Sequence, residues 1–98
     1  MNNPYDPDQC EHWAYERGHT FGGNEKWPVY EESRLDSVAM SHVRDMWKPY
    51  ARNADGKVTN HTRQAHKDHA ARPDSEFADR AAAYKRGYLD GSKTRTPE

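Results

Sequence analysis

The sequence predicts an all-α fold, a small domain of three helices whose first and last helices pack together as a pseudo-twofold pair. Two stretches near opposite ends of the chain, residues 14–22 and 83–91, share the pattern A-Y-x-R-G-x-x-x-G. Between them, apolar residues recur at the i, i+3, i+4 spacing of an amphipathic helix. Proline and glycine lie at the ends of these segments, where helices begin and end.

The repeated pattern predicts how the first and last helices meet. In each copy an alanine and two glycines fall at i, i+4 and i+8, which is one row on a helix. A row without large side chains lets two helix backbones approach closely. Each interior glycine costs about 1 kcal/mol relative to alanine, which close packing would offset. The second glycine of each copy has an alternative interpretation as an ordinary C-terminal cap. The residues expected to pack are Ala14, Gly18, Gly22, Ala83, Gly87 and Gly91.

The first helix is expected over about residues 7–21. Asp6 is the predicted N-cap, and Pro7 suits the first helical position. The glycines at 22 and 23 would end the helix. We place three further side chains on the same side as the alanine–glycine row: Cys10, Trp13 and Phe21.

The second and last helices are predicted from periodicity and from proline. The second begins between residues 28 and 33 and is ended by Pro49, because the residue before a proline avoids helical geometry. The last begins after Pro73 and ends at Gly91, with Phe77 and Tyr84 in its apolar stripe. The central helix is expected to cover the helix pair with Leu35, Val38, Val43 and Met46.

The chain is expected to be one domain over residues 1–98, with tails at 1–5 and 93–98. Residues 51–72 are expected to be flexible without a partner. A helix over 57–72 would be polar nearly all round, and therefore either solvated or dependent on a partner.

Composition indicates a thin, aromatic core. Hydrophobic residues make up 33% of the 98 residues and charged residues 32%, yet the chain contains three Trp, six Tyr and two Phe. A core this small often needs a second subunit or a target to complete it, so a homodimer is one expected state. The single cysteine is compatible with a reducing cytoplasm, and no apolar run approaches the length of a membrane span. We therefore expect a cytoplasmic protein without membrane partners.

Parts of the chain resemble the ribosome modulation factor family and its small phage-borne relatives. Residues 3–5 (N-P-Y) and 11–18 (EHWAYERG) look like one half of the family motif, and residues 83–91 resemble the other. The two halves stand in the opposite order here, and residues 24–75 form an insertion. The resemblance implies a small helical hairpin, an RNA- or ribosome-contacting activity, and an origin in a phage or prophage.

Candidate contact residues fall into two groups, and neither is a catalytic set. No nucleophile–base–orienter arrangement, P-loop or CxxC motif is present, and we expect no enzyme, cofactor or metal site. His61, His66 and His69 can be read as metal ligands, but a basic solvated segment is the preferred interpretation. The candidate partner-binding residues are Arg17, Arg86, Trp27, Tyr30, Trp47 and Tyr50. The candidate phosphate- or RNA-contacting residues are Lys57, Arg63, Lys67 and Arg72.

Three functions remain open on the sequence. The first is a small protein-binding module that inhibits or modulates a host complex, since Trp and Tyr are common interface anchors. Filling of the core is the alternative role for those aromatic residues. The second is a ribosome- or RNA-binding protein, which the basic segment and the family resemblance favour. The third is a sponge for a nucleotide signal, with the two repeated arginines and the tyrosines holding bases.

Overall fold

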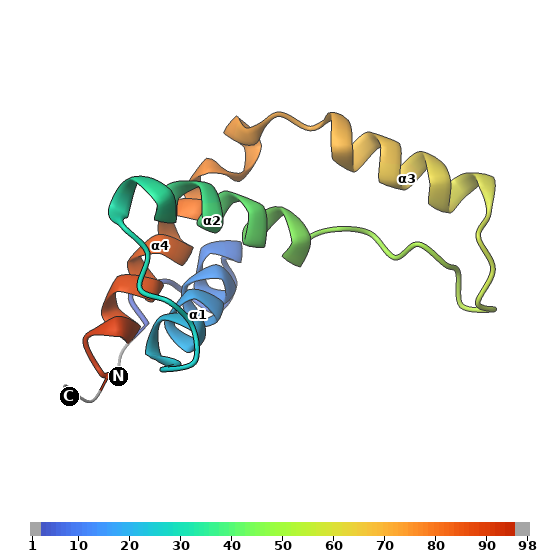
Figure 1. Ribbon diagram of the computed structural model, residues 1–98. Helices are drawn as coiled ribbons and strands as arrows, with labels where there is room; N and C mark the ends of the chain where they lie inside the picture. The colour runs from blue at the N-terminus through green and yellow to red at the C-terminus, as the bar shows by residue number, and fades with distance from the viewer. Residues whose placement is uncertain (1–2, 96–98) are drawn as a thin grey trace.

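The computed structural model describes residues 3–95, and over that range the chain is all-helical (Figure 1). The predicted fold class is confirmed, although these residues contain four α-helices where three were expected. In chain order the elements are α1 (Cys10–Gly23), α2 (Glu32–Met46), α3 (Asn60–Ala71), the short 3-10 helix η1 (Asp74–Phe77) and α4 (Ala78–Ser92).

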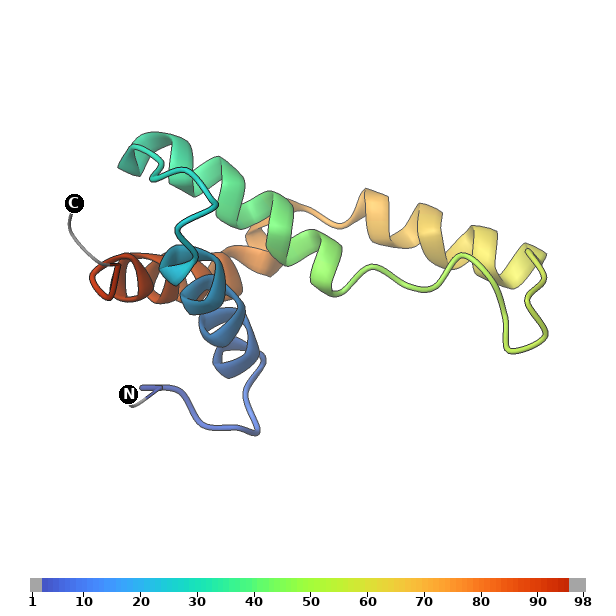
Figure 2. The same ribbon diagram turned by 60° about the horizontal axis from the view of Figure 1, so that its bottom comes forward.

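Helices α1 and α4 cross in direct backbone contact, as predicted from the repeat (Figure 2). A Cβ added to Gly18 would lie 2.1 Å from the carbonyl oxygen of Tyr84. A Cβ added to Gly87 would lie 2.1 Å from the carbonyl oxygen of Tyr15. Because Tyr15 and Tyr84 hold the same place in the two copies of the pattern, exchanging the copies reproduces the contact. The helix pair is therefore pseudo-twofold in its closest contacts.

The second glycine of each pattern lies inside its helix and packs in the same way. A Cβ on Gly22 would lie 2.1 Å from the carbonyl oxygen of Tyr88, and one on Gly91 would lie 2.3 Å from that of His19. Within residues 3–95 a positive φ occurs only at Gly56, at 79°. The interpretation of these two glycines as left-handed helix caps is therefore wrong, and α1 continues through Gly22 to Gly23.

Helix α2 covers the pair from the α4 side. Leu35, Ala39 and Val43 form its fully buried face, and they pack with buried aromatic residues of η1 and α4. Lys85 of α4 reinforces this contact, since its Nζ lies 3.1 Å from Oε1 of Glu32 and 2.9 Å from Oδ1 of Asp36. The buried side chains are Ala14, Tyr15, Leu35, Ala39, Val43, Phe77, Ala81, Ala83, Tyr84 and Tyr88.

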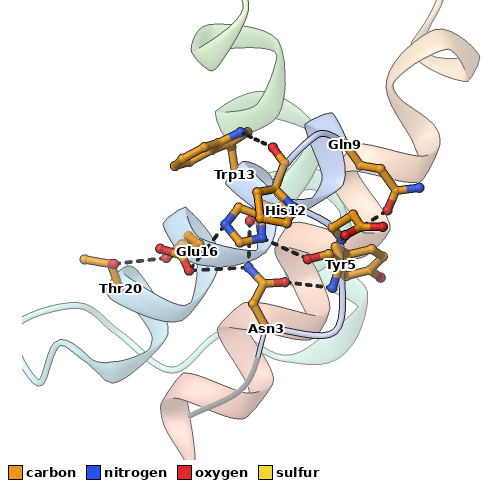
Figure 3. Close-up of polar contacts among 9 residues, drawn as sticks. Asn3, Tyr5, Gln9, His12, Trp13, Glu16 and Thr20 are labelled. Atoms are coloured by element: carbon orange, nitrogen blue, oxygen red, sulfur yellow. Dashed lines mark hydrogen bonds and ion pairs between the residues drawn. The ribbon is translucent and has the colours of Figure 1, made fainter.

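The N-terminal segment folds back along α1, so that the helix begins at Cys10 and not at residue 7 (Figure 3). Asn3 Nδ2 donates to the carbonyl oxygen of His12 at 2.9 Å, and Asn3 Oδ1 accepts from the Tyr5 amide at 2.9 Å. His12 Nδ1 donates to the carbonyl oxygen of Tyr5 at 2.9 Å. Residues 6–9 form a turn in place of the expected first helical turn, and residues 3–5 are held against α1 although a tail was expected.

The polar segment 57–72 contains α3, which projects away from the three packed helices (Figures 1 and 2). Its start signal, which was not predicted, is a capping box in which the side chains of Thr59 and Thr62 accept from each other's backbone amides. At its other end, Arg44 donates to the carbonyl oxygens of Arg72 and His69 at 2.9 and 3.1 Å. The His69 carbonyl oxygen also accepts from the Arg72 amide at 3.2 Å, and Arg44 adds further donors at this end of the helix, so Arg44 caps α3 from α2.

Candidate protein-binding surface

Two adjoining hollows lie between α1 and α2, with volumes of about 410 and 430 Å³. They share Arg17 and Met46 as walls. The first is completed by Phe21, Trp27, His42 and Asp45, and the second by Trp13, Glu16, Thr20 and Trp47. We call this surface the aromatic groove, after six of its residues: Trp13, Arg17, Phe21, Trp27, Met46 and Trp47.

The groove exists because α2 packs mainly against α4, while its contact with α1 is slight and includes the His42 and Phe21 rings. On α1, Trp13 and Arg17 are four residues apart, so they lie one above the other on one helix face. This face adjoins the alanine–glycine row without being part of the contact with α4. Met46 and Trp47 stand at the end of α2, opposite that face. Trp13 was expected on the packed side of the first helix, and that expectation is wrong because the contact with α4 is confined to the narrow row of small residues.

Two of the tryptophans in the groove are exposed and yet held in place. Trp13 is 54% exposed, and its Nε1 donates to the carbonyl oxygen of Pro7 at 3.2 Å (Figure 3). Trp27 is 39% exposed, and its ring meets the ring of Phe21 edge-on at 4.9 Å between centroids. Rings fixed in this way lose little conformational entropy when a partner covers them.

Arg17 supplies an unpaired positive charge at the centre of the groove. It is exposed, and no carboxylate within residues 3–95 forms an ion pair with it. Arg80, also beside the groove, makes a cation–π contact, because its guanidinium lies 4.7 Å from the ring centroid of Trp47. Arg17 is thus the arginine that a ligand in the groove would meet, together with the carboxylates of Glu16 and Asp45.

His42 lines the same hollow as Arg17 and connects the groove to the core. Its Nδ1 is hydrogen-bonded to the hydroxyl of Tyr84, and its ring lies 5.3 Å from that of Phe21. Burial lowers the pKa of His42, and the nearby Asp45 carboxylate opposes this in part. A neutral imidazole held by a buried tyrosine is a structural support for the groove, in keeping with its predicted role as a hydrogen-bonded core residue.

Three of the predicted partner-binding residues lie outside the groove. The guanidinium of Arg86 lies 6.0 Å from the ring centroid of Tyr5. Tyr30 packs against Tyr88 with 6.1 Å between ring centroids, so it contributes to the core. Tyr50 is 90% exposed in the segment that leads to α3. The structure therefore brings together Arg17, Trp27 and Trp47 and separates the other three.

The surroundings of the two repeated arginines differ in a way that explains the groove. Tyr5, from the N-terminal segment, lies next to Arg86 and packs against Tyr15, the tyrosine of the first copy of the repeat. The equivalent position beside Arg17 is occupied by the smaller ring of His42, which contacts Tyr84, the tyrosine of the second copy. The hollow beside Arg17 stays open.

The candidate phosphate-contacting residues also divide. Arg63 and Lys67 of α3 line a separate hollow of about 270 Å³, and Lys57 is exposed near the start of the helix. Arg72 is instead turned to η1, where its Nε donates to Oε2 of Glu76 at 2.7 Å. In the described part of the chain, no three His, Cys, Asp or Glu side chains are grouped to hold a metal ion.

Comparison of the chain with protein-family models, with curated proteins and with solved structures finds no match. The resemblance to the ribosome modulation factor family therefore stays a prediction. Across residues 3–95, no helix combines the length and the apolar character that crossing a membrane requires.

Trp13, Phe21 and Met46 were not predicted to line a binding surface, because each fits an apolar helix face. A usable signal was the spacing of Trp13, Arg17 and Phe21 at i, i+4 and i+8. This row runs beside the alanine–glycine row and one residue out of phase with it. Once the small residues are assigned to the contact with α4, the parallel row must face elsewhere.

Proposed function

We propose that the chain is a non-enzymatic protein-binding module and that the aromatic groove is its contact surface. The observation that carries the proposal is the gathering of all three tryptophans of the chain around Arg17. Tryptophan and arginine dominate the residues that contribute most to protein–protein binding, and methionine and aromatic residues are enriched in interfaces. Two of these tryptophans remain substantially exposed.

The groove has the layout expected of such a contact. Its aromatic side chains and Met46 surround Arg17, and exposed polar side chains from both helices, Glu16, Thr20 and Asp45, line it as well. A polar rim that excludes water from a central anchor is the usual arrangement of an interface. A partner would place an apolar side chain between the rings.

The neighbour of Arg86 indicates which kind of side chain fits beside Arg17, because the two arginines hold the same position in the repeat. Next to Arg86 that group is Tyr5, which an extended segment delivers to the helix pair. An aromatic ring beneath a guanidinium is a favourable contact. We therefore propose that the partner presents an aromatic side chain to Arg17 from an extended segment.

The test is capture of partners from a lysate of the source cell on the immobilised protein, with stepwise elution by salt. The variants Trp13→Ala and Arg17→Ala change the groove, and Arg34→Ala, an exposed arginine of α2 outside both hollows, is the matched control. We expect discrete proteins that withstand high salt on the parent and the control and are lost from both groove variants. Truncation of a residue central to binding weakens it about thirtyfold or more.

Thermal melts of all three variants show whether the fold is retained. Recovery of the same proteins on every variant would contradict the proposal. Recovery of RNA and ribosomal proteins in the first salt steps, unaffected by Trp13→Ala, would favour the alternative function.

A further inference from the structure

Residues 48–72, which we call the arm, carry a charge opposite to that of the rest of the chain. The arm consists of the connecting segment 48–59 and α3. It contains six basic and two acidic residues, whereas the other residues of the chain include nine basic and fourteen acidic ones. The arm extends to one side of the packed helices, and the molecule measures 51 Å along its longest axis against 27 and 25 Å across.

The arm is poorly supported by the rest of the molecule. Thr62 is the one buried residue of α3, and the body holds the helix at its C-terminal end, through Arg44, His69 and Phe77. A helix of 12 residues is marginally stable in water, and α3 lacks an apolar face to bury. A partner that covers the arm would therefore stabilise a helix that the body leaves exposed.

Residues of the connecting segment and of α3 line an open, apolar hollow of about 270 Å³. Ala51 and Val58 form its wall on one side, and Val58 is 45% exposed. On the other side are Arg63 and Lys67, one turn apart on α3. Neither of these two cations has an ion-pair partner within residues 3–95. The hollow is completed by Thr62 and His66.

We propose that the arm binds an acidic segment of another protein. That segment would place an aliphatic side chain in the hollow beside Val58 and carboxylates against Arg63 and Lys67. Charge complementarity selects an acidic partner, and the aliphatic wall selects one with an apolar side chain. Single-stranded nucleic acid is a poorer match for the hollow, because it is held by aromatic platforms, and the exposed aromatic ring of the arm, Tyr50, is not among the residues that line it.

This inference is independent of the function proposed for the aromatic groove, because it concerns different residues on a different element. Trp13 and Arg17 lie on α1, whereas Val58, Arg63 and Lys67 belong to the arm. Either surface can fail its own test without affecting the other. A chain with both would connect two protein segments of different chemistry.

The test uses the full-length protein labelled with ¹⁵N and four probes. The first is a short peptide of glutamate with leucines spaced four residues apart. The second has serine in place of leucine, the third has lysine in place of glutamate, and the fourth is polyuridine RNA. We expect the glutamate–leucine peptide to shift the amide signals of Val58, Arg63 and Lys67 and the other probes to bind more weakly.

A charge-swapped variant, Arg63→Glu with Lys67→Glu, makes the test independent of any loss of folding. Exposed ion pairs are individually weak, so reversing the charge of two side chains should lower the affinity for the glutamate–leucine peptide about tenfold. The same variant should gain affinity for the lysine–leucine peptide. Arg34→Glu, with a reversal on α2 away from the arm, is the control and should bind like the parent.

Four results would overturn the proposal. The first is that the glutamate–leucine peptide leaves the amide signals of the arm unchanged. The second is that the serine peptide binds equally well, which would show that the hollow plays no part in binding. Tighter binding of polyuridine that is lost in the charge-swapped variant would assign the arm to nucleic acid. Self-association in sedimentation that the same variant abolishes would assign it to a second copy of this chain.

Discussion

Replacement of Gly18 by alanine tests the packing of α1 on α4 with the smallest available change. The added Cβ would lie 2.1 Å from the carbonyl oxygen of Tyr84, about 1.3 Å short of the 3.4 Å at which ordinary contact begins. This oxygen belongs to a helix backbone and cannot rotate away, so the helices must separate. Overpacking costs typically about 1–3 kcal/mol, and the gain in helix propensity returns about 1 kcal/mol. Because the clash is severe, we take the upper part of that range and expect the free energy of unfolding to fall by about 2 kcal/mol in total.

Gly23→Ala is the matched control on the same helix. Its Cβ would meet Oγ1 of the Thr94 side chain at 3.3 Å and the carbonyl oxygen of Gly91 at 3.4 Å. These contacts are near ordinary distances, so the control should change stability by less than about 1 kcal/mol.

The assay is thermal unfolding followed by circular dichroism at the helical wavelength. In a domain of this size, a loss of about 2 kcal/mol lowers Tm by about 8–16 °C. Gly87→Ala should lower Tm by the same amount as Gly18→Ala, because its Cβ faces the carbonyl oxygen of Tyr15 at the same 2.1 Å. The double variant should lose less than the sum, because one separation of the helices relieves both contacts. A Gly18→Ala protein that melts at or above the parent temperature would refute the reasoning.

Three further predictions concern hydrogen bonds that tie the elements together. Because burial lowers the pKa of His42 below 6.5, the unfolded chain takes up the proton more readily, and the free energy of unfolding should fall as pH drops below 6.5. Urea titrations at several pH values should show that the free energy of unfolding depends less on pH in His42→Gln than in the parent. An unchanged pH dependence would exclude His42 as its source. Burial and the hydrogen bond to Asp90 raise the pKa of Tyr15 to about 12, so Tyr15→Phe should remove one tyrosine transition near pH 12 from an alkaline absorbance titration. The same variant should lose about 1.5–3 kcal/mol, because its partner at 2.6 Å is a carboxylate. Arg44→Met should speed hydrogen exchange in α3 while leaving that of α1 and α4 unchanged, and equal protection of α3 would contradict the capping role.

The helix pair could be predicted from the sequence because its determinants are local and repeated. Gly18 and Gly87 are interior glycines in identical contexts, and a row of small residues has few uses other than close packing. The stripe on the last helix was predictable for a similar reason, since its apolar residues follow a single period. These features require no knowledge of the rest of the fold.

The other features depend on contacts that are distant in sequence. The start of α1 is set by Asn3 and His12, which bond across nine residues, so local capping rules placed it too early. Helix α3 depends on Arg44 of α2 for its cap, and its polar sequence gives no periodic signal.

The aromatic groove could be predicted only in part. Arg17, Trp27 and Trp47 were identified one by one, but their meeting depends on α2 packing against α4 and leaving α1 partly uncovered. The pseudo-twofold relation sets Arg86 apart from Arg17, and segments outside the repeat give the two arginines different neighbours, Tyr5 beside Arg86 and His42 beside Arg17.

Site-specific photo-crosslinking tests the central claim, that the aromatic groove contacts another protein. A photoreactive phenylalanine analogue is introduced at Thr20, which lines the groove, and separately at Ala82, an exposed residue of α4 that lines neither hollow. Both proteins are irradiated in the source cell, and crosslinked species are identified by mass spectrometry. We predict a discrete crosslinked protein from position 20 that is lost when Trp13→Ala is added, and none from position 82. Identical products from the two positions, or products from position 20 that persist in the Trp13→Ala background, would contradict the account.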